Sequence, residues 1–450
     1  TGYTRQGALT VLARIRPDRV ENVRQRLRQI SNEADGGVEK NPVLPFQEIR
    51  SVHFARFLLL EAAKDADGSP VPARLVFSTN YDFPLAEHLA ELVGQPGLAS
   101  VFCHCEGFPA EPGPAPVLDY LRRHAVRPTA FYVGTRGRSV GRIHYEAKLR
   151  EDIQDFLDAT ERHSAGQWEG LATNPATIKA GIEAFVANRP AAPTPRPATG
   201  GIEQYLVRWF PFPGLYAGVA LLVGVGVAFP RPSAALVGGL VLLGLAFLIG
   251  LRWHEQRDEQ RRPLETDADP TDQAVGELTA REDQIVQNQL SHVVDVKPGW
   301  FRRLTLKVVL RVIHLLAAVV FNRGQLGKIP TIHFARWVLI DRGRKLLFFS
   351  NFDGSWENYL GDFIDQAALG LTAVWSNTAR FPATRYLIRQ GATDEQRFKR
   401  WTRNHQVPTQ VWFSAYKKLT VENINRNSKI HEGLYRRMNE RQVREWLQLL

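Results

Sequence analysis

Apolar and polar positions alternate and then change period in a fixed order along the first part of the chain. Alternation around Leu9 predicts a strand, and the three-to-four-residue spacing over 18–32 predicts an amphipathic helix. The octet HFARFLLL, which starts at His53, predicts the first strand of a hairpin. A second helix over 84–93 and a fourth strand over 98–104 complete the unit. This order is typical of a four-stranded antiparallel sheet with helices on one face, the ferredoxin-like arrangement.

The second half of the chain repeats the first half in the same order. HFARFLLL at His53 corresponds to HFARWVLI at His333, and the strand around Leu9 corresponds to one around Leu290. Three more pairs of segments follow: LVFSTNYD with LLFFSNFD, LASVFCHCEGFP with LTAVWSNTARFP, and PTAFYV with PTQVWF. These repeats indicate an internal duplication of a whole unit. Two such units can cover each other's open sheet by packing face to face.

Two apolar runs without charge lie between the copies, over 210–229 and 233–251, and only a Pro-Arg-Pro turn separates them. Each run is close to the roughly 20 residues that a helix needs to cross a bilayer. The sequence therefore predicts a transmembrane helical hairpin over 209–252; a buried hairpin in a soluble core is the alternative. Arginines flank both outer ends, so the positive-inside rule predicts that both soluble halves face the cytoplasm.

These features divide the chain into five parts. Copy one covers 1–185 and copy two covers 284–450, and the hairpin lies between a Pro-rich linker over 186–208 and a charged linker over 253–283. The predicted fold class is α+β, with two duplicated ferredoxin-like units packed sheet to sheet and a two-helix transmembrane hairpin over 209–252.

The first helix of copy two, over 299–321, is far more apolar than its counterpart in copy one. Its polar residues form a basic stripe at helical spacing: Arg303, Lys307, Arg311 and His314. A basic stripe on an apolar helix is typical of a helix that lies in the plane of lipid headgroups. The sequence therefore predicts an interfacial helix here, and copy two would rest on the membrane.

The composition of the chain indicates which kinds of partner and compartment to expect. The formal net charge of +11 indicates an anionic partner, and we expect a phospholipid membrane and not nucleic acid. The two cysteines, Cys103 and Cys105, are too few to hold together a chain of 450 residues, so we expect a reducing compartment. The sequence has no Gly-rich phosphate loop, HExxH, G-x-S-x-G or dinucleotide-binding motif, which argues against the enzyme classes that these motifs mark.

Tandem ferredoxin-like units packed through their sheets resemble the dimeric α+β barrel superfamily. Its members include chlorite dismutases and dye-decolorising peroxidases, which hold haem, and small oxygenases, which do not. SNFDG over 350–354 is similar to the Gly-x-x-Asp-Gly motif of dye-decolorising peroxidases, although Ser350 stands in place of the first Gly. The resemblance implies a proton-transferring role for Asp353. It leaves the haem ligand open among three histidines: His333, His405 and His431.

The repeated polar residues support two interpretations. His333 and Arg336 are three apart on a strand, which predicts that they face opposite sides of the sheet. In a catalytic interpretation Asp353 or His333 moves protons, Arg336 holds an anion and Asn351 adds a polar contact. In a structural interpretation Asp82 and Asp353 each cap the helix that follows. The repeated histidines and arginines then hydrogen-bond the hairpins or pair with these two aspartates.

Copy two also gathers large rings around these positions: Trp337, Phe348, Phe349, Phe352, Trp356, Tyr359, Trp375, Trp412, Phe413 and Tyr416. Such rings line an apolar ligand pocket or fill a core. One hypothesis is a membrane-anchored, cytoplasm-facing oxidoreductase that acts on an apolar or lipid-like substrate by peroxidase or oxygenase chemistry. The resemblance leaves the cofactor open between haem and none, and no separate metal site is predicted. The alternative is a non-catalytic membrane-bound scaffold or lipid-binding protein that docks a partner enzyme.

Overall fold

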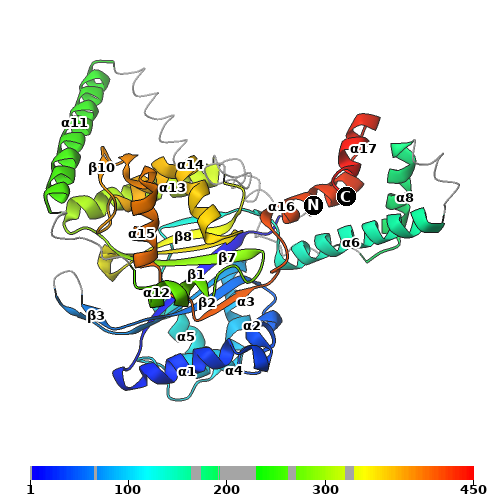
Figure 1. Ribbon diagram of the computed structural model, residues 1–450, viewed down its shortest axis with the longest axis horizontal. Coiled ribbons are helices and arrows are strands. Elements are labelled where there is room, and N and C mark those ends of the chain that lie inside the picture. The colour runs from blue at the N-terminus through cyan, green and yellow to red at the C-terminus, as the bar shows by residue number, and fades with distance from the viewer. Residues whose placement is uncertain are drawn as a thin grey trace.

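The computed structural model describes residues 3–64, 68–163, 174–190, 192, 230–261, 270–319 and 329–450. The fold is α+β, as predicted, and all paired strands in this part of the chain are antiparallel. Figure 1 shows the two main sheets at the centre of the molecule, with the C-terminal helices and one long helix extending from them.

Copy one contributes four strands to the main sheets: β1 (Gln6–Arg14), β2 (Val52–Leu60), β5 (Arg74–Asp82) and β6 (Ala130–Val133). Its principal helices are α1 (Val20–Ile30), α3 (Leu85–Val93), α4 (Pro96–Phe102), α5 (Pro114–His124), α6 (Val140–His163) and α8 (Pro175–Ala187). The short elements α2 (Gly37–Lys40), β3 (Ala63–Lys64) and β4 (Pro70–Val71) lie in its connections.

Copy two follows the same order, with the strands β7 (Gln287–Asp295), β8 (Ile332–Ile340), β9 (Lys345–Asp353) and β12 (Val411–Ser414). Its helices are α13 (Trp300–Val319), α14 (Trp356–Trp375), α15 (Glu395–His405), α16 (Val421–Leu434) and α17 (Glu440–Leu447). A small hairpin joins β10 (Thr384–Arg385) and β11 (Arg389–Gln390). In the sequence, helices α11 (Pro230–Arg261) and α12 (Asp272–Thr279) come between the two copies.

The copies exchange a strand. The first sheet has the order β1-β5-β2-β12 and the second has the order β6-β8-β9-β7, so each sheet takes its fourth strand from the other copy. Val411 pairs with Phe57, and Ala130 pairs with Trp337. The predicted strand over 98–104 is wrong: most of it lies in helix α4, because Pro96 in the first turn favours a helix start.

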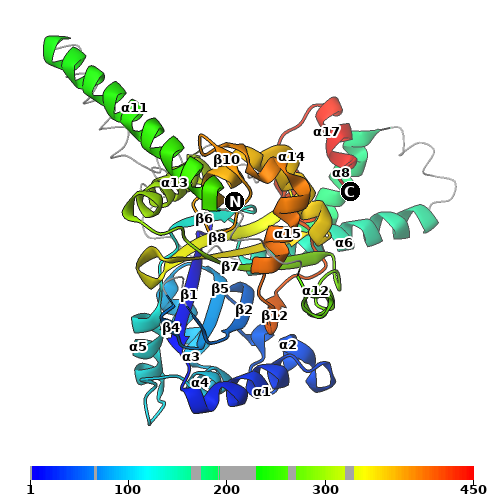
Figure 2. The ribbon, with the colours of Figure 1, turned by 60° about the vertical axis from the view of Figure 1, so that its left-hand side comes forward.

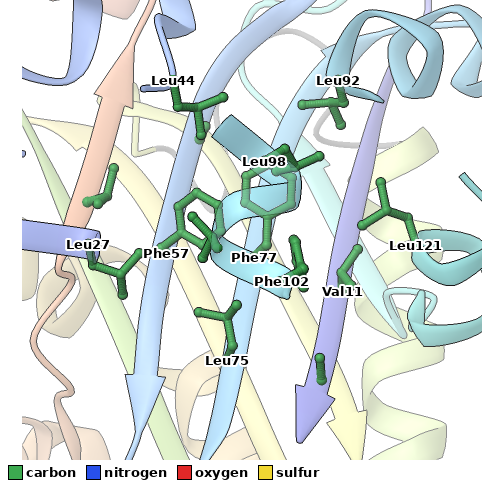
Figure 3. Close-up of a cluster of buried hydrophobic side chains, with 14 of the residues drawn as sticks. Val11, Leu27, Leu44, Phe57, Leu75, Phe77, Leu92, Leu98, Phe102 and Leu121 are labelled. Carbon is green, nitrogen blue, oxygen red and sulfur yellow. The ribbon is translucent and has the colours of Figure 1, made fainter. Parts of the chain in front are cut away.

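The two sheets pack face to face, as predicted, and helices cover their outer faces. Apolar side chains of β2 and β5 meet those of β8 and β9 in one inter-sheet cluster that includes Leu58, Val76, Val338 and Leu347. Figure 2 shows α1, α3, α4 and α5 on the outer side of the first sheet and α13, α14 and α15 on the outer side of the second. Figure 3 shows the core under the first group of helices, where Phe57 and Phe77 lie among leucines of the surrounding elements.

The C-terminal helices of the two copies also pack together. Helix α6 lies against α16, and Leu149 and Ile153 of α6 share a buried apolar cluster with Ile430 and Leu434 of α16. Helices α8 and α17 join the same cluster, which extends to one side of the sheets (Figure 1). The sheets and these helices are therefore two separate places where the copies meet.

The predicted transmembrane hairpin over 209–252 is wrong. Its first run, 210–229, lies outside the described residues, and its second run falls within α11. In the described part of the chain, no helix is long and apolar enough to cross a membrane. The prediction treated 233–251 as a separate segment, whereas α11 is one helix that continues through the charged residues up to Arg261. The predicted membrane localisation, with both halves on the cytoplasmic side, is wrong with it.

The C-terminal part of α11 packs on copy two instead. Leu251 is buried against Ala373 and Leu387. The carboxylate of Glu255, which is also buried, accepts hydrogen bonds from the backbone N–H groups of Tyr386 at 2.9 Å and Leu387 at 2.7 Å. The first part of α11 extends away from the rest of the molecule (Figure 2).

Candidate functional site

The repeated histidines and arginines face the same side of their sheets. A β-bulge interrupts β2 between Val52 and Phe54, and another interrupts β8 between Ile332 and Phe334. The prediction of opposite faces is therefore wrong, because each bulge adds one residue to the period of two. His333 lies 5.3 Å from the ring of Phe54 in the other copy, measured between ring centroids.

Each histidine forms a buried pair with the aspartate at the end of the next strand. His53 Nε2 lies 3.0 Å from Asp82 Oδ1, and His333 Nε2 lies 2.7 Å from Asp353 Oδ1. The second carboxylate oxygen accepts a backbone N–H: Asp82 from Val140 at 3.0 Å, and Asp353 from Val421 at 2.8 Å. The aspartates therefore hold the starts of α6 and α16.

The predicted capping of the next helix by these aspartates is wrong in copy two, where Ser355 caps α14 through the N–H of Asn358. In copy one, α3 starts after Pro84 without a side-chain cap. The predicted pairing with a histidine is correct, but the helix that each aspartate holds comes much later in the chain. Asp353 and His333 therefore lie together inside the protein.

Tyr416 distinguishes the two histidine pairs. Its hydroxyl group lies 3.0 Å from His53 Nδ1. The pKa of Tyr416 is raised well above its ordinary value, chiefly by burial and to a smaller extent by the charges of Asp82 and Asp353. His333 Nδ1 is buried without a hydrogen-bond partner. The His53 pair thus extends through Nδ1 to Tyr416, whereas the third side chain at the His333 pair is Gln287, whose Nε2 lies 3.5 Å from His333 Nε2.

Arg336 connects the second sheet to the first. Its guanidinium donates to the carbonyl oxygens of Leu9 at 2.7 Å and Thr79 at 2.9 Å, and to the side chain of Asn80 at 3.1 Å. Burial lowers the pKa of Arg336 to about 9, so the side chain still carries its charge at neutral pH. Its planar donors are matched by acceptors of the protein, which argues against the predicted role of holding an anion.

Arg56 makes the equivalent contacts in the opposite direction. It donates to the carbonyl oxygens of Leu290 and Ser350, both at 2.9 Å, and to Asn351 Oδ1 at 2.5 Å. Burial and the nearby charge of Arg336 lower its pKa well below the ordinary value. Asn351 also donates to Asn80 Oδ1 at 3.2 Å, so the predicted site residue Asn351 lies at the contact between the sheets.

The aromatic residues of copy two do not form one pocket. Trp337, Phe348 and Tyr359 belong to the core of copy two, whereas Phe413, on the exchanged strand β12, belongs to the core of copy one. The remaining cavity among the rings of β9, α14 and α15 has a volume of about 20 Å³. Ligand pockets have volumes of roughly 300 to 1,000 Å³, so the rings of β9, α14 and α15 fill a core. Phe413 and Tyr416 line a different cavity, of about 770 Å³.

The structure places the three histidines that the resemblance left open as haem ligands in three different settings. His333 is fully buried and paired with Asp353. His405 Nδ1 lies 2.8 Å from the carbonyl oxygen of Trp401 in its own helix, and His431 Nδ1 lies 3.0 Å from the carboxylate of Glu146. None of them lines the cavity among the aromatic rings. Among the described residues, no three His, Cys, Asp or Glu side chains are arranged to hold a metal ion.

Several structural residues were not identified from the sequence. Gln6 donates to the carbonyl oxygens of Thr135 and Arg138, both at 2.8 Å, and Gln287 donates to those of Tyr416 and Leu419 at 3.1 and 2.6 Å. Both glutamines lie three residues before the leucines that aligned the first strands. The duplication thus contained a signal for them.

Comparisons with known proteins do not assign the chain to a family. No protein-family model matches the chain, and no curated protein or solved structure matches it significantly. The resemblance to the dimeric α+β barrel superfamily stays a prediction.

Proposed function

We propose that this chain is a non-catalytic docking protein, in which the paired copies form a rigid support and helices α11 and α13 bind a partner protein. The observation that carries the proposal is the exposure of large apolar side chains on both helices. On α11 these are Val241, Leu242, Leu243, Leu245, Phe247, Leu248, Ile249 and Trp253. On α13 they are Trp300, Leu304, Val308, Val312 and Leu316. We call these residues together the apolar surface.

An apolar surface of this extent is typical of a binding site for another macromolecule. The two helices are adjacent, because Phe247 and His254 of α11 lie 5.5 and 4.8 Å from the ring of Phe301 at the start of α13. On α11 the exposed side chains lie around the helix, since Leu242, Leu243 and Leu245 are more than half exposed. A partner protein can enclose such a helix.

The polar residues between the copies support a scaffold better than a catalyst. Arg56 and Arg336 each bind backbone carbonyl groups of the other copy, and His333 and Asp353 hold the start of α16. The hydrogen bonds of these side chains are made to other groups of the same chain. Buried networks of this kind fix the relative position of the elements that they join.

The proposal can be tested by photo-crosslinking in the organism that makes the protein. A photoreactive amino acid is placed at Leu304 or Val308, and at Arg122, an exposed residue of α5, as the control. We expect the same protein adduct at both α13 positions and none at position 122. The partner identified by mass spectrometry should then bind the purified chain, and Leu304→Glu with Val308→Glu should weaken that binding by at least about tenfold.

Three results would contradict this function. Adducts that contain only lipid would assign the apolar surface to a bilayer, and adducts with a second copy of this chain would assign it to self-association. Equal labelling at Arg122 and at the two α13 positions would show that the surface binds nothing specifically.

A further inference from the structure

The exposed side of α13 has a regular composition. Its apolar side chains recur at every fourth position, and their exposed fractions are 71% for Trp300, 52% for Leu304, 53% for Val308, 48% for Val312 and 37% for Leu316. At a rise of about 1.5 Å per residue, this row is roughly 24 Å long. Each step of four residues turns about 40° beyond a full turn, so the row winds around α13, and Leu304, Val308 and Val312 lie within about 80° of one another. These three side chains can face one partner helix.

The opposite side of α13 fixes the orientation of this row. Leu306 and Leu310 are fully buried in the core of copy two. Arg302 is also buried and donates to Asp258 of α11 at 2.6 Å. Because these contacts hold the helix in place, rotation of α13 cannot bury the exposed row against the described part of the chain.

A second row, of basic residues, runs beside the apolar one. Arg303, Lys307 and Arg311 recur at the same spacing of four. Arg303 donates to the carbonyl oxygen of Gly299. Lys307 and Arg311, both exposed, form no ion pair with an acidic group of the described residues. Two cations beside an apolar row select a partner that carries carboxylates next to its own apolar side.

We propose that α13 binds an acidic amphipathic helix of the partner protein, with apolar side chains against Leu304, Val308 and Val312 and carboxylates against Lys307 and Arg311. This inference rests on the proposed docking function and specifies its ligand. A second copy of the chain is a poorer occupant, because pairing two α13 helices would bring their basic rows together. A flat lipid surface is also poorer, since it would cover only one side of the adjacent α11.

The test uses the full chain and two labelled helical peptides of about 20 residues. Both peptides carry the same leucines, which are flanked by glutamate in one peptide and by lysine in the other. By fluorescence anisotropy at low salt, we expect the acidic peptide to bind at least about tenfold more tightly. This preference should decrease as salt screens the charges.

Charge reversal provides the matched control. Lys307→Glu with Arg311→Glu should remove the preference for the acidic peptide or reverse it, whereas Arg122→Glu with Arg123→Glu on α5 should leave it unchanged. All four side chains are exposed, so both double variants should fold, which circular dichroism checks. A preference that survives reversal on α13 overturns the inference, as does tighter binding of the basic peptide.

Two further outcomes separate this inference from the docking function. If neither peptide binds while the protein adducts at Leu304 and Val308 persist, the acidic helix is refuted and the docking function stands. If vesicles of phosphatidylserine and phosphatidylcholine bind the wild-type chain but not the Lys307→Glu, Arg311→Glu variant, and no protein adduct forms, both proposals fail.

Discussion

The hydroxyl group of Tyr416 lies 3.0 Å from Nδ1 of His53, although the two residues are 363 positions apart. A side chain of copy two thus completes the hydrogen bonding of a buried pair in copy one. Tyr416→Phe should leave His53 Nδ1 without this partner and lower the free energy of unfolding by about 1 to 2 kcal/mol. Denaturant unfolding measures the change. Tyr435→Phe is the control, since Tyr435 is 72% exposed, and an equal loss in both variants would contradict the prediction.

Arg336 offers a second test of how the copies hold together. Arg336→Met should leave the carbonyl groups of Leu9 and Thr79 without their donors in a buried setting, and we expect a loss of about 3 kcal/mol or more. Arg122→Met, at an exposed position, should change stability by less than about 0.5 kcal/mol. A small effect of the first substitution would mean that the sheets do not depend on the arginine.

His292 should make the protein less stable in acid. It is fully buried, and burial, followed by the charge of His405, lowers its pKa to about 3. In the unfolded chain a histidine takes up a proton near pH 6.5, so between about pH 6.5 and 3 the unfolded state binds more protons. The free energy of unfolding therefore falls as the pH falls through this window, by up to about 1.4 kcal/mol per unit.

His292→Gln removes this contribution. We expect the dependence of the unfolding free energy on pH to be weaker in the variant by about one bound proton between pH 4 and 6. Above about pH 7 the two dependences should be the same. Parallel curves at acid pH would show that His292 is not held neutral in the folded protein.

The exchanged strands predict that the two halves of the chain associate without a covalent connection. Co-expressed chains covering 3–190 and 230–450 should form a one-to-one complex, because β6 and β12 each complete the sheet of the other half. Size-exclusion chromatography with light scattering measures the stoichiometry. Phe413→Pro, which removes a backbone N–H from β12 and restricts its conformation, should weaken the complex. Two monomeric halves would contradict the strand exchange.

Much of the fold could be predicted from the sequence, because period and duplication are local or directly comparable signals. The strands at Leu9, His53 and His333 and the helix over 299–321 were predicted near the positions of β1, β2, β8 and α13. The exchange of β6 and β12 was not predicted, since the pairing partner of a short strand depends on contacts between residues far apart in the chain. The apolar run over 98–104 was also too short to separate a buried strand from a helix by its period.

For the candidate site, the residues could be identified but not their geometry. The repeats identified the histidine pairs, and pairing with an aspartate was one of the predicted structural roles. A single extra residue in each strand then reversed the side that His53 and His333 face. Bulges leave no mark in a pattern of apolar and polar residues when both sides of a strand are buried, as in β2, where the burial extends over nearly the whole strand.

The strand exchange also has a consequence during synthesis on the ribosome. β2 has two neighbours in its sheet. One of them, β5, is complete at Asp82, but the other, β12, begins only at Val411. At about 5 to 20 residues per second, the edge of β2 waits roughly 15 to 65 s for its neighbour. During that interval the nascent first copy exposes an unpaired strand edge to other chains. Molecular chaperones that cover such edges should therefore bind this polypeptide before its translation ends.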